Sequence, residues 1–208
     1  MVRYSKNFSQ LYDEVMYLPD KIFLKFRRKR LLSGLSGKIL EVGVGTGTNF
    51  QHYNNDTEVI GIEPSPYMFT KAENRKNRLP FPNRFTLHNI GCGYSEMQGL
   101  IQPESLDAVV CTLVLCTVPE PQKALTNFMK WLKPGGRLII LEHVRAHHRV
   151  GIKAQNLLNP AWERLAEGCQ LNRPTDILLA ESGFQLVREE YFWLGLPFYE
   201  AEFKKPEK

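Results

Sequence analysis

Short apolar runs and amphipathic stretches alternate along most of the chain. Five runs are rich enough in Val, Ile and Leu to predict buried strands, at residues 38–42, 59–63, 84–90, 106–115 and 137–142. Apolar positions at helical spacing predict a helix that begins at 49–53 and further helices over 67–78, 122–132, 151–168 and 175–182. Strands that alternate with helices in this way are typical of a parallel sheet covered by helices on both faces.

The two ends of the chain depart from this alternation. Residues 8–35 have the spacing of one or two amphipathic helices broken near Pro19, so we expect residues 1–36 to form an N-terminal helical cap. Two further strands, at 185–193 and 199–203, close the chain, and we expect the last one to be antiparallel. Within the preceding helix, Pro160 is expected to cause an interruption or a kink.

The size and composition of the chain suit a single globular unit. Its 208 residues, 43% hydrophobic and 24% charged, can bury a full sheet and its helices, so residues 37–208 are predicted to be one domain. The formal charge of +5 is concentrated in residues 25–30 and 71–78, which we interpret as solvated helix faces. No nucleic-acid motif accompanies them, so no nucleic-acid partner is expected.

The spacing of the cysteines and the length of the apolar runs give expectations about metal binding and cellular location. Cys92, Cys111, Cys116 and Cys169 lack the paired short spacing of a zinc site, so we expect no metal and a reduced interior. The longest nearly apolar run, residues 108–118, is far below the roughly 18 residues that a membrane span needs. No signal pattern occurs at the N-terminus, and a cytoplasmic location is therefore expected.

A glycine-rich segment carries the strongest chemical signal. The strand at 38–42 runs into Gly43, Gly45 and Gly47, a spacing that lets the backbone turn tightly and approach a ligand without a Cβ in the way. Glu63 follows Gly43 by 20 residues, at the end of the second strand, where an acidic side chain meets the ribose hydroxyls of a bound nucleotide. This geometry serves NAD and S-adenosylmethionine alike.

The glycine pattern distinguishes these two ligands. A dinucleotide site favours GxGxxG, whereas this chain has GxGxG followed by Thr48. At this point the chain resembles class I S-adenosylmethionine-dependent methyltransferases. Their first motif is matched by Glu41, Gly43, Gly45 and Gly47, their ribose-binding acid by Glu63, and a later turn by residues 132–136. The resemblance implies an α/β Rossmann-like fold, with a mostly parallel seven-stranded sheet, helices on both faces and the N-terminal helical cap.

Further segments narrow the resemblance. The stretches CTLVLCTV (111–118), EHV (142–144), NPAW (159–162) and GCQLNR (168–173) resemble the alkyl-thiol methyltransferases of the methyltransferase-like seven group and related bacterial type 11 methyltransferases. The resemblance implies methyl transfer from S-adenosylmethionine, with S-adenosylhomocysteine as product, to a small apolar acceptor. A thiol is favoured over a phenol or an amine. The animal proteins begin with a hydrophobic anchor that has no counterpart before Lys38, so their membrane location is not expected here.

The motifs and the edge of the predicted sheet together nominate the site residues. Thr112, Leu113 and Val114 end the fourth strand, at the edge where open parallel sheets bind ligands, and Met68 is placed to pack on the adenine or in the core. The cofactor-binding set comprises Glu41, Gly43, Gly45, Thr46, Gly47, Asn49, Glu63, Pro64, Met68, Gly93, Tyr94, Thr112, Leu113 and Val114. For Gly93 and Tyr94 a plain loop is the alternative.

Chemistry at the acceptor requires proton removal from a thiol or a phenol. His143 follows the fifth strand and titrates near neutrality, so we nominate it as the base, the alternative being a structural hydrogen bond to a neighbouring loop. Tyr12 and Trp162 are expected to line the substrate pocket, although a large aromatic residue on a helix is more often part of a core.

Two other functions stay open at this point. The first is a phospholipid headgroup N-methyltransferase, with residues 25–30 resting on an anionic membrane surface, a contact that is not favoured. The second is a nucleotide-binding protein without transferase activity, related to dehydrogenases. The expected partner is a small-molecule acceptor, and the protein is expected to be a monomer or a homodimer.

Overall fold

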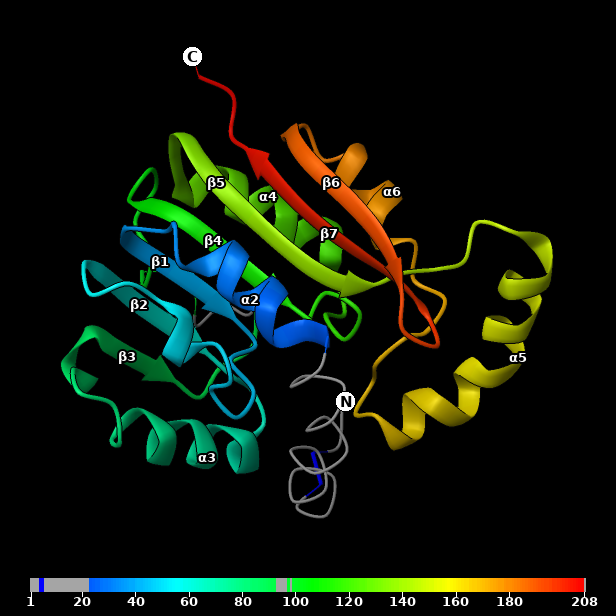
Figure 1. Cartoon of the computed structure of the whole chain (residues 1–208), viewed down its shortest axis with the longest axis horizontal. Coiled ribbons are helices and arrows are strands. Elements are labelled where there is room, and N and C mark those ends of the chain that lie inside the picture. The colour runs from blue at the N-terminus through cyan, green and yellow to red at the C-terminus, as the bar shows by residue number, and fades with distance from the viewer. Residues whose placement is uncertain (1–3, 6–22, 93–96, 98, 208) are drawn as a thin grey trace.

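A seven-stranded sheet forms the centre of the computed structural model, which describes residues 4–5, 23–92, 97 and 99–207 (Figure 1). The strand order is β3-β2-β1-β4-β5-β7-β6. The strands are β1 (Gly37–Val42), β2 (Thr57–Ile62), β3 (Phe85–His88), β4 (Leu106–Thr112), β5 (Leu132–His143), β6 (Gln185–Trp193) and β7 (Pro197–Lys204). The first five strands are parallel to one another, and β7 runs antiparallel between β5 and β6, as predicted.

Helices cover both faces of this sheet, and successive strand residues point to opposite sides. Leu40 of β1 belongs to a core cluster with α4 (Pro121–Trp131) and α6 (Thr175–Ala180). Its neighbour Ile39 belongs to a second cluster with α2 (Lys25–Leu32) and α3 (Pro66–Lys76). Both faces of the central strands are therefore buried by apolar side chains. Polar side chains lie where the strands end.

Two predicted elements are shorter than expected, and both changes shape the site. The helix expected to begin at 49–53 is a single 3-10 turn, Phe50–His52, because Tyr53 is already extended and packs near Phe85. A second 3-10 turn, Pro82–Arg84, precedes β3. The fourth strand ends at Thr112 instead of Leu115, because Leu113 has φ +57°, a left-handed conformation that a strand cannot contain.

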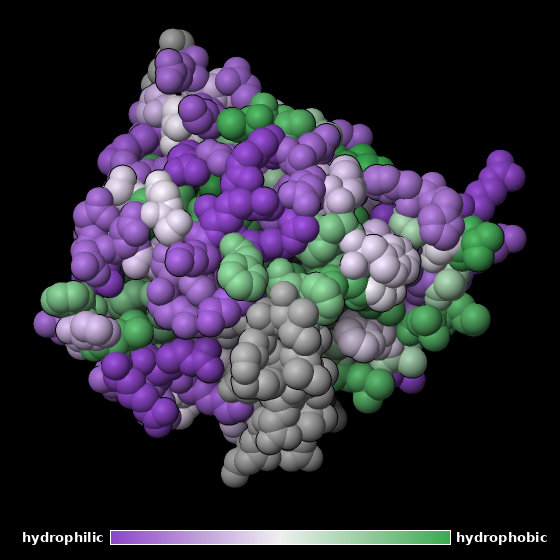
Figure 2. Space-filling view, viewed as in Figure 1, coloured by the Kyte–Doolittle hydropathy of each residue, from purple (hydrophilic) through white to green (hydrophobic). Residues whose placement is uncertain are grey.

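In two other places a strand or a helix continues where an interruption was predicted. Residues 132–136 were expected to form a turn, but β5 already begins at Leu132 and pairs with Leu106 of β4. Pro160 does not interrupt its helix, since α5 runs continuously from Arg149 to Leu165, and the alternative, a kink at Pro160, stays a prediction. Helix α5 stands away from the sheet in Figure 1, and Figure 2 shows apolar surface on that side, to which it contributes Val150, Leu157, Leu158 and Leu165.

The basic run at 25–30 lies on α2, and it is not simply a solvated face. Arg27 and Arg30 each reach Glu200 of β7, at 2.9 and 2.8 Å, and each also pairs with Glu190 of β6. The same helix directs Arg28 into the interior. Residues 6–22 of the predicted N-terminal cap lie outside the described residues. In the part of the chain that is described, no helix is both long and apolar enough to cross a membrane.

Candidate active site

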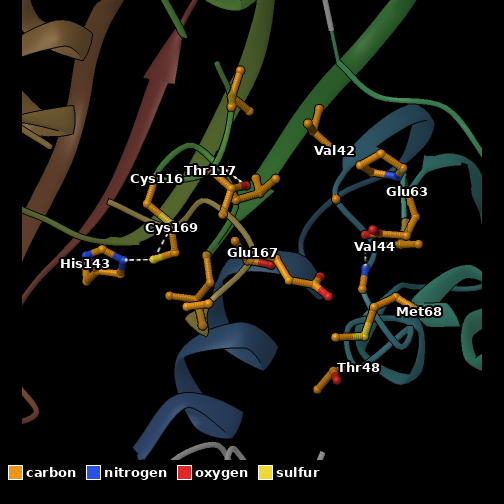
Figure 3. Close-up of a pocket in the computed structure, with 18 of the residues that line it drawn as sticks. Val42, Val44, Thr48, Glu63, Met68, Cys116, Thr117, His143, Glu167 and Cys169 are labelled. Carbon is orange, nitrogen blue, oxygen red and sulfur yellow. Dashed lines mark hydrogen bonds between the residues drawn. The ribbon is translucent and has the colours of Figure 1, made fainter. Parts of the chain in front are cut away.

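A cavity of about 400 Å³ opens at the carboxyl ends of β1, β2 and β4. Parallel sheets of this kind bind their ligands at that edge, where the strand order reverses. Figure 3 shows Glu63, Val44 and Met68 at one end of the cavity and His143, Cys169 and Cys116 at the other. The two ends thus present different chemistry to one continuous space.

The glycine-rich turn forms the first end of the cavity. Gly43 and Gly45 have φ +66° and +56°, which a side chain would strain. A Cβ on Gly43 would lie 2.3 Å from Cγ2 of Val114, whereas a Cβ on Gly45 would meet no protein atom within 4 Å. Gly43 is therefore required for packing, and Gly45 borders free space that a ligand can enter.

Glu63 holds this turn from the end of β2. One carboxylate oxygen accepts from the Gly45 amide and the other from the Ser65 amide, each at 2.9 Å. Burial raises the pKa of Glu63 to about 7, although these two hydrogen bonds oppose the shift. Each oxygen keeps a further lone pair, so the carboxylate can accept from the two hydroxyls of a ribose as well.

A buried polar network supports the turn from below. Asn49 Nδ2 donates to Glu41 Oε1 and to Thr112 Oγ1, both at 2.9 Å, and the Tyr53 hydroxyl donates to Glu41 Oε2. Arg28 Nη1 completes the network by donating to Asn49 Oδ1 at 2.7 Å and to Thr112 Oγ1 at 3.1 Å. Burial raises the pKa of Glu41 to about 7. The network therefore joins α2 to the ends of β1 and β4.

The loop after β4 is held in a strained shape by Glu142. Leu113 takes its left-handed conformation directly at the cavity wall. The next two amides, of Val114 and Leu115, both donate to Glu142 Oε1, at 2.8 and 2.9 Å. Burial raises the pKa of Glu142 to about 7, and these two hydrogen bonds act in the opposite direction. Glu142 thus does not line the cavity itself, but it fixes the backbone of the loop that forms this part of the cavity wall.

Two cysteines and a histidine form the other end of the cavity. His143 Nε2 lies 3.1 Å from Cys169 Sγ, which lies 3.4 Å from Cys116 Sγ. Hydrogen bonds from Cys116 and His143 lower the pKa of Cys169 to about 4. Burial would lower the pKa of His143, but the hydrogen bond and charge of Cys169 outweigh it and raise that pKa. Among the described residues, His143 Nδ1 has no hydrogen-bond partner.

Most of the residues nominated from the sequence line this cavity. They are Gly43, Gly45, Thr46, Asn49, Glu63, Pro64, Met68, Thr112, Leu113, Val114, His143 and Trp162. Glu41 and Gly47 do not line it: Glu41 lies beneath the turn, and a Cβ on Gly47 would meet the Phe50 ring at 2.4 Å. In this structure both residues support the turn, and their contact with the cofactor stays a prediction. Gly93, Tyr94 and Tyr12 lie outside the described residues.

Sequence reasoning missed several lining residues. Arg28 was assigned to a solvated face, yet it is 5% exposed and borders the cavity. Cys116 occurs in a segment that carries the resemblance, but nothing in its spacing shows that it meets Cys169 at the cavity wall. Thr48 and Glu167 also line the cavity and have no motif that marks them.

Comparisons with known proteins agree with this geometry. A family described as a methyltransferase domain matches residues 40–140. The thiol S-methyltransferase TMT1B of Rattus norvegicus is 35% identical over 179 residues, which cover 83% of this chain and 70% of that protein. The thiol S-methyltransferase TMT1A of Homo sapiens is also 35% identical, over 88% of this chain and 75% of its own length.

A solved structure shows the same fold. The geranyl diphosphate C-methyltransferase of Streptomyces coelicolor A3(2), in complex with Mg²⁺, geranyl diphosphate and S-adenosylhomocysteine, superposes with a TM-score of 0.66. It is 10% identical, and the match covers 87% of this chain and 78% of that one. At this identity the likeness concerns the fold.

Proposed function

Because the chain belongs to the S-adenosylmethionine-dependent methyltransferases, in the family that includes the thiol S-methyltransferases TMT1A and TMT1B, we propose that it methylates a thiol on a small apolar molecule. The observation that carries the proposal is the single cavity that joins the Glu63 turn to the cluster of His143 and Cys169. One end suits a nucleoside and the other suits a sulfur nucleophile. The acceptor is small, since both ligands must share about 400 Å³.

The turn fits the methyl donor. The free space beside Gly45 and the remaining lone pairs of Glu63 would take the ribose, while Met68 and Pro64 line the same end of the cavity. Bound S-adenosylmethionine supplies an electrophilic methyl group on a sulfonium centre. The protein then has to place an acceptor about 3 Å from that methyl group and exclude water, which buried apolar walls achieve.

The acceptor end has a different task, because a thiol must lose its proton before it reacts well. Leu196, Phe198 and Trp162 line this end and favour an apolar acceptor. His143 is our candidate for the group that promotes proton loss, although its Nε2 is engaged by Cys169. We infer that the histidine and the cysteine act together at this end.

The ion pairs of α2 support a small-molecule acceptor over a lipid headgroup. An anionic surface would be held by free cations, at about 1 kcal/mol each. Arg27 and Arg30 instead bind Glu190 and Glu200 of their own chain. These pairs reduce the charge that α2 can offer to a membrane surface.

The test is a transfer assay with radiolabelled S-adenosylmethionine and apolar thiols, phenols and amines of matched size. We expect label in the thiol products and S-adenosylhomocysteine in equal amount. Glu63→Gln should weaken donor binding and lower transfer to every acceptor. Transfer to phenols or amines but not to thiols would refute the choice of acceptor.

A binding measurement tests the cofactor separately. S-adenosylhomocysteine should raise the melting temperature, with about 2.7 kcal/mol of stabilisation at one hundred times its dissociation constant. NAD should leave the melting temperature unchanged. Stabilisation by NAD alone would favour the dehydrogenase relative instead.

A further inference from the structure

Cys116, His143 and Cys169 come together from three separate segments of the chain. Cys116 follows β4, His143 ends β5, and Cys169 follows α5. Their Sγ, Nε2 and Sγ atoms all lie within 4.8 Å of one another. Figure 3 shows the three side chains converging at the acceptor end of the cavity. We call them the Cys-His-Cys cluster.

The ligand atoms of this cluster match the preferences of one metal ion. Two thiolates and an imidazole are ligands of Zn²⁺, and catalytic zinc sites hold three protein ligands and leave the fourth position open. Alkaline-earth ions prefer oxygen ligands, which the cluster lacks. Two thiolates also balance the charge of a divalent cation, so the site can be neutral where it is buried.

The spacing of the cluster is close to that of a tetrahedral site. Zn–S and Zn–N bonds of about 2.3 and 2.05 Å place two sulfurs about 3.8 Å apart and a sulfur and a nitrogen about 3.6 Å apart. The corresponding distances here are 3.4 Å between the sulfurs and 3.1 Å between Cys169 Sγ and His143 Nε2. These two separations must grow by about 0.4–0.5 Å. The third, between Cys116 Sγ and His143 Nε2, lies within 4.8 Å and has to settle at about 3.6 Å, and side-chain rotations can provide these changes.

We propose that Cys116, His143 and Cys169 bind Zn²⁺, with the fourth coordination position facing the cavity and open to the sulfur of the acceptor. All three side chains line the cavity, so that position is accessible to a small ligand. The part of this proposal that concerns the acceptor rests on the proposed thiol methyltransferase function. The metal site itself does not.

Zn²⁺ at this site would promote loss of the proton from the acceptor thiol. The acceptor thiol gives its proton to bulk water as its sulfur binds the ion, because a coordinated thiol is deprotonated. A sulfur lone pair then forms the bond to the methyl carbon. The carbon–sulfur bond of the sulfonium breaks, and its electron pair stays on the sulfur of S-adenosylhomocysteine. The neutral thioether product is a weaker ligand than the thiolate and leaves. In this scheme His143 is a ligand rather than a free base.

Zinc uptake by the whole chain tests the site without a methyl donor or a thiol substrate. The protein is stripped with a chelator under a phosphine reductant, dialysed, and titrated with Zn²⁺ against a competing indicator, and bound zinc is counted by mass spectrometry. We expect one Zn²⁺ per chain. Co²⁺ in its place should give the charge-transfer absorption of thiolate ligation.

Variants assign the zinc to the cluster. Cys116→Ser and Cys169→Ser should each weaken Zn²⁺ by more than about 100-fold, since loss of even an outer-sphere partner costs 10–100-fold. Cys111→Ala is the matched control, because Cys111 is also buried but lies on β4 outside the cluster. It should bind Zn²⁺ as the unaltered chain does. Circular dichroism confirms that each variant is folded.

A measurement on the unaltered chain covers the case in which a variant does not fold. Zn²⁺ should protect Cys116 and Cys169 from iodoacetamide, while alkylation of Cys92 should not change. Absence of zinc uptake by the reduced chain would overturn the metal site. So would zinc affinity in both serine variants equal to that of the unaltered chain.

Activity separates this inference from the proposed function. If zinc-free protein methylates thiols at the full rate, the role of zinc at the acceptor is wrong and the thiol methyltransferase stands; the metal site is then judged by zinc uptake alone. If zinc binds the cluster but no thiol is methylated, the metal site stands and the proposed acceptor is wrong.

Discussion

Replacing Gly45 by Ala should separate donor binding from stability. At φ +56° an alanine costs about 1–2 kcal/mol, which for a chain of this size lowers the melting temperature by about 2–8 °C. The added Cβ meets no protein atom within 4 Å, so it enters the cavity itself. We expect the folded variant to bind S-adenosylhomocysteine at least about tenfold more weakly, a loss of about 1.4 kcal/mol.

Gly43→Ala should behave in the opposite way. Its Cβ would stand 2.3 Å from Val114 Cγ2, so overpacking of about 1–3 kcal/mol adds to the backbone strain. The free energy of unfolding should fall by about 2–5 kcal/mol in total. Gly34→Ala is the control, because no atom lies within 4 Å of its Cβ and the position is remote from the cavity. It should change neither quantity.

Calorimetry with S-adenosylhomocysteine and thermal melts of the ligand-free proteins measure the two effects. The reasoning fails if folded Gly45→Ala binds the ligand with unchanged affinity, because the space beside Gly45 would then not be the donor site. It also fails if Gly43→Ala melts like the unaltered chain.

Three further predictions concern buried charged groups. Arg28→Met should lower the free energy of unfolding by about 3 kcal/mol, because hydrogen bonds to Asn49 and Thr112 are lost from the interior, and denaturant titration measures this. With a Glu63 pKa of about 7, lowering the pH from 8 to 6 protonates the carboxylate that we propose as the ribose acceptor, so affinity for S-adenosylhomocysteine should fall about tenfold. Glu63→Gln should show no such step. Glu200→Gln should lower the melting temperature by several degrees and make it less sensitive to salt, because Glu200 is 1% exposed and holds ion pairs from α2 and β6; an unchanged melting curve would contradict this.

The parts of the site that depend on local sequence were predictable. A buried strand followed by Gly43 and Gly45 specifies its own turn, because only glycine takes those dihedrals without strain. The distance from Gly43 to Glu63 follows from one crossover between adjacent parallel strands, β1 and β2. The strands of the sheet were predictable for a similar reason, since each strand carries its own apolar pattern. The last strand is antiparallel because the connection from Trp193 to Pro197 is too short for a parallel crossover.

The parts that depend on tertiary contact were not predictable. Arg28 sits in a run of five charges among six residues, and charge of that density is usually solvated. Its burial depends on Asn49 and Thr112, which lie 21 and 84 residues away. In the same way, the absence of short cysteine spacing excludes only a local metal site. Cys116 and Cys169 are separated by 53 residues and meet through the ends of β4 and α5.

The ion pairs of Glu200 have a consequence for the order of events during synthesis. Helix α2 is made early, but its partner in β7 follows 170 residues later than Arg30, about 10–30 s at ribosomal rates. Until then Arg27 and Arg30 lack the acid that neutralises them, and one edge of β5 lacks its neighbour. The incomplete nascent chain therefore exposes an unpaired strand edge together with a patch of positive charge on α2. Repulsion between such patches on two nascent chains would oppose their aggregation.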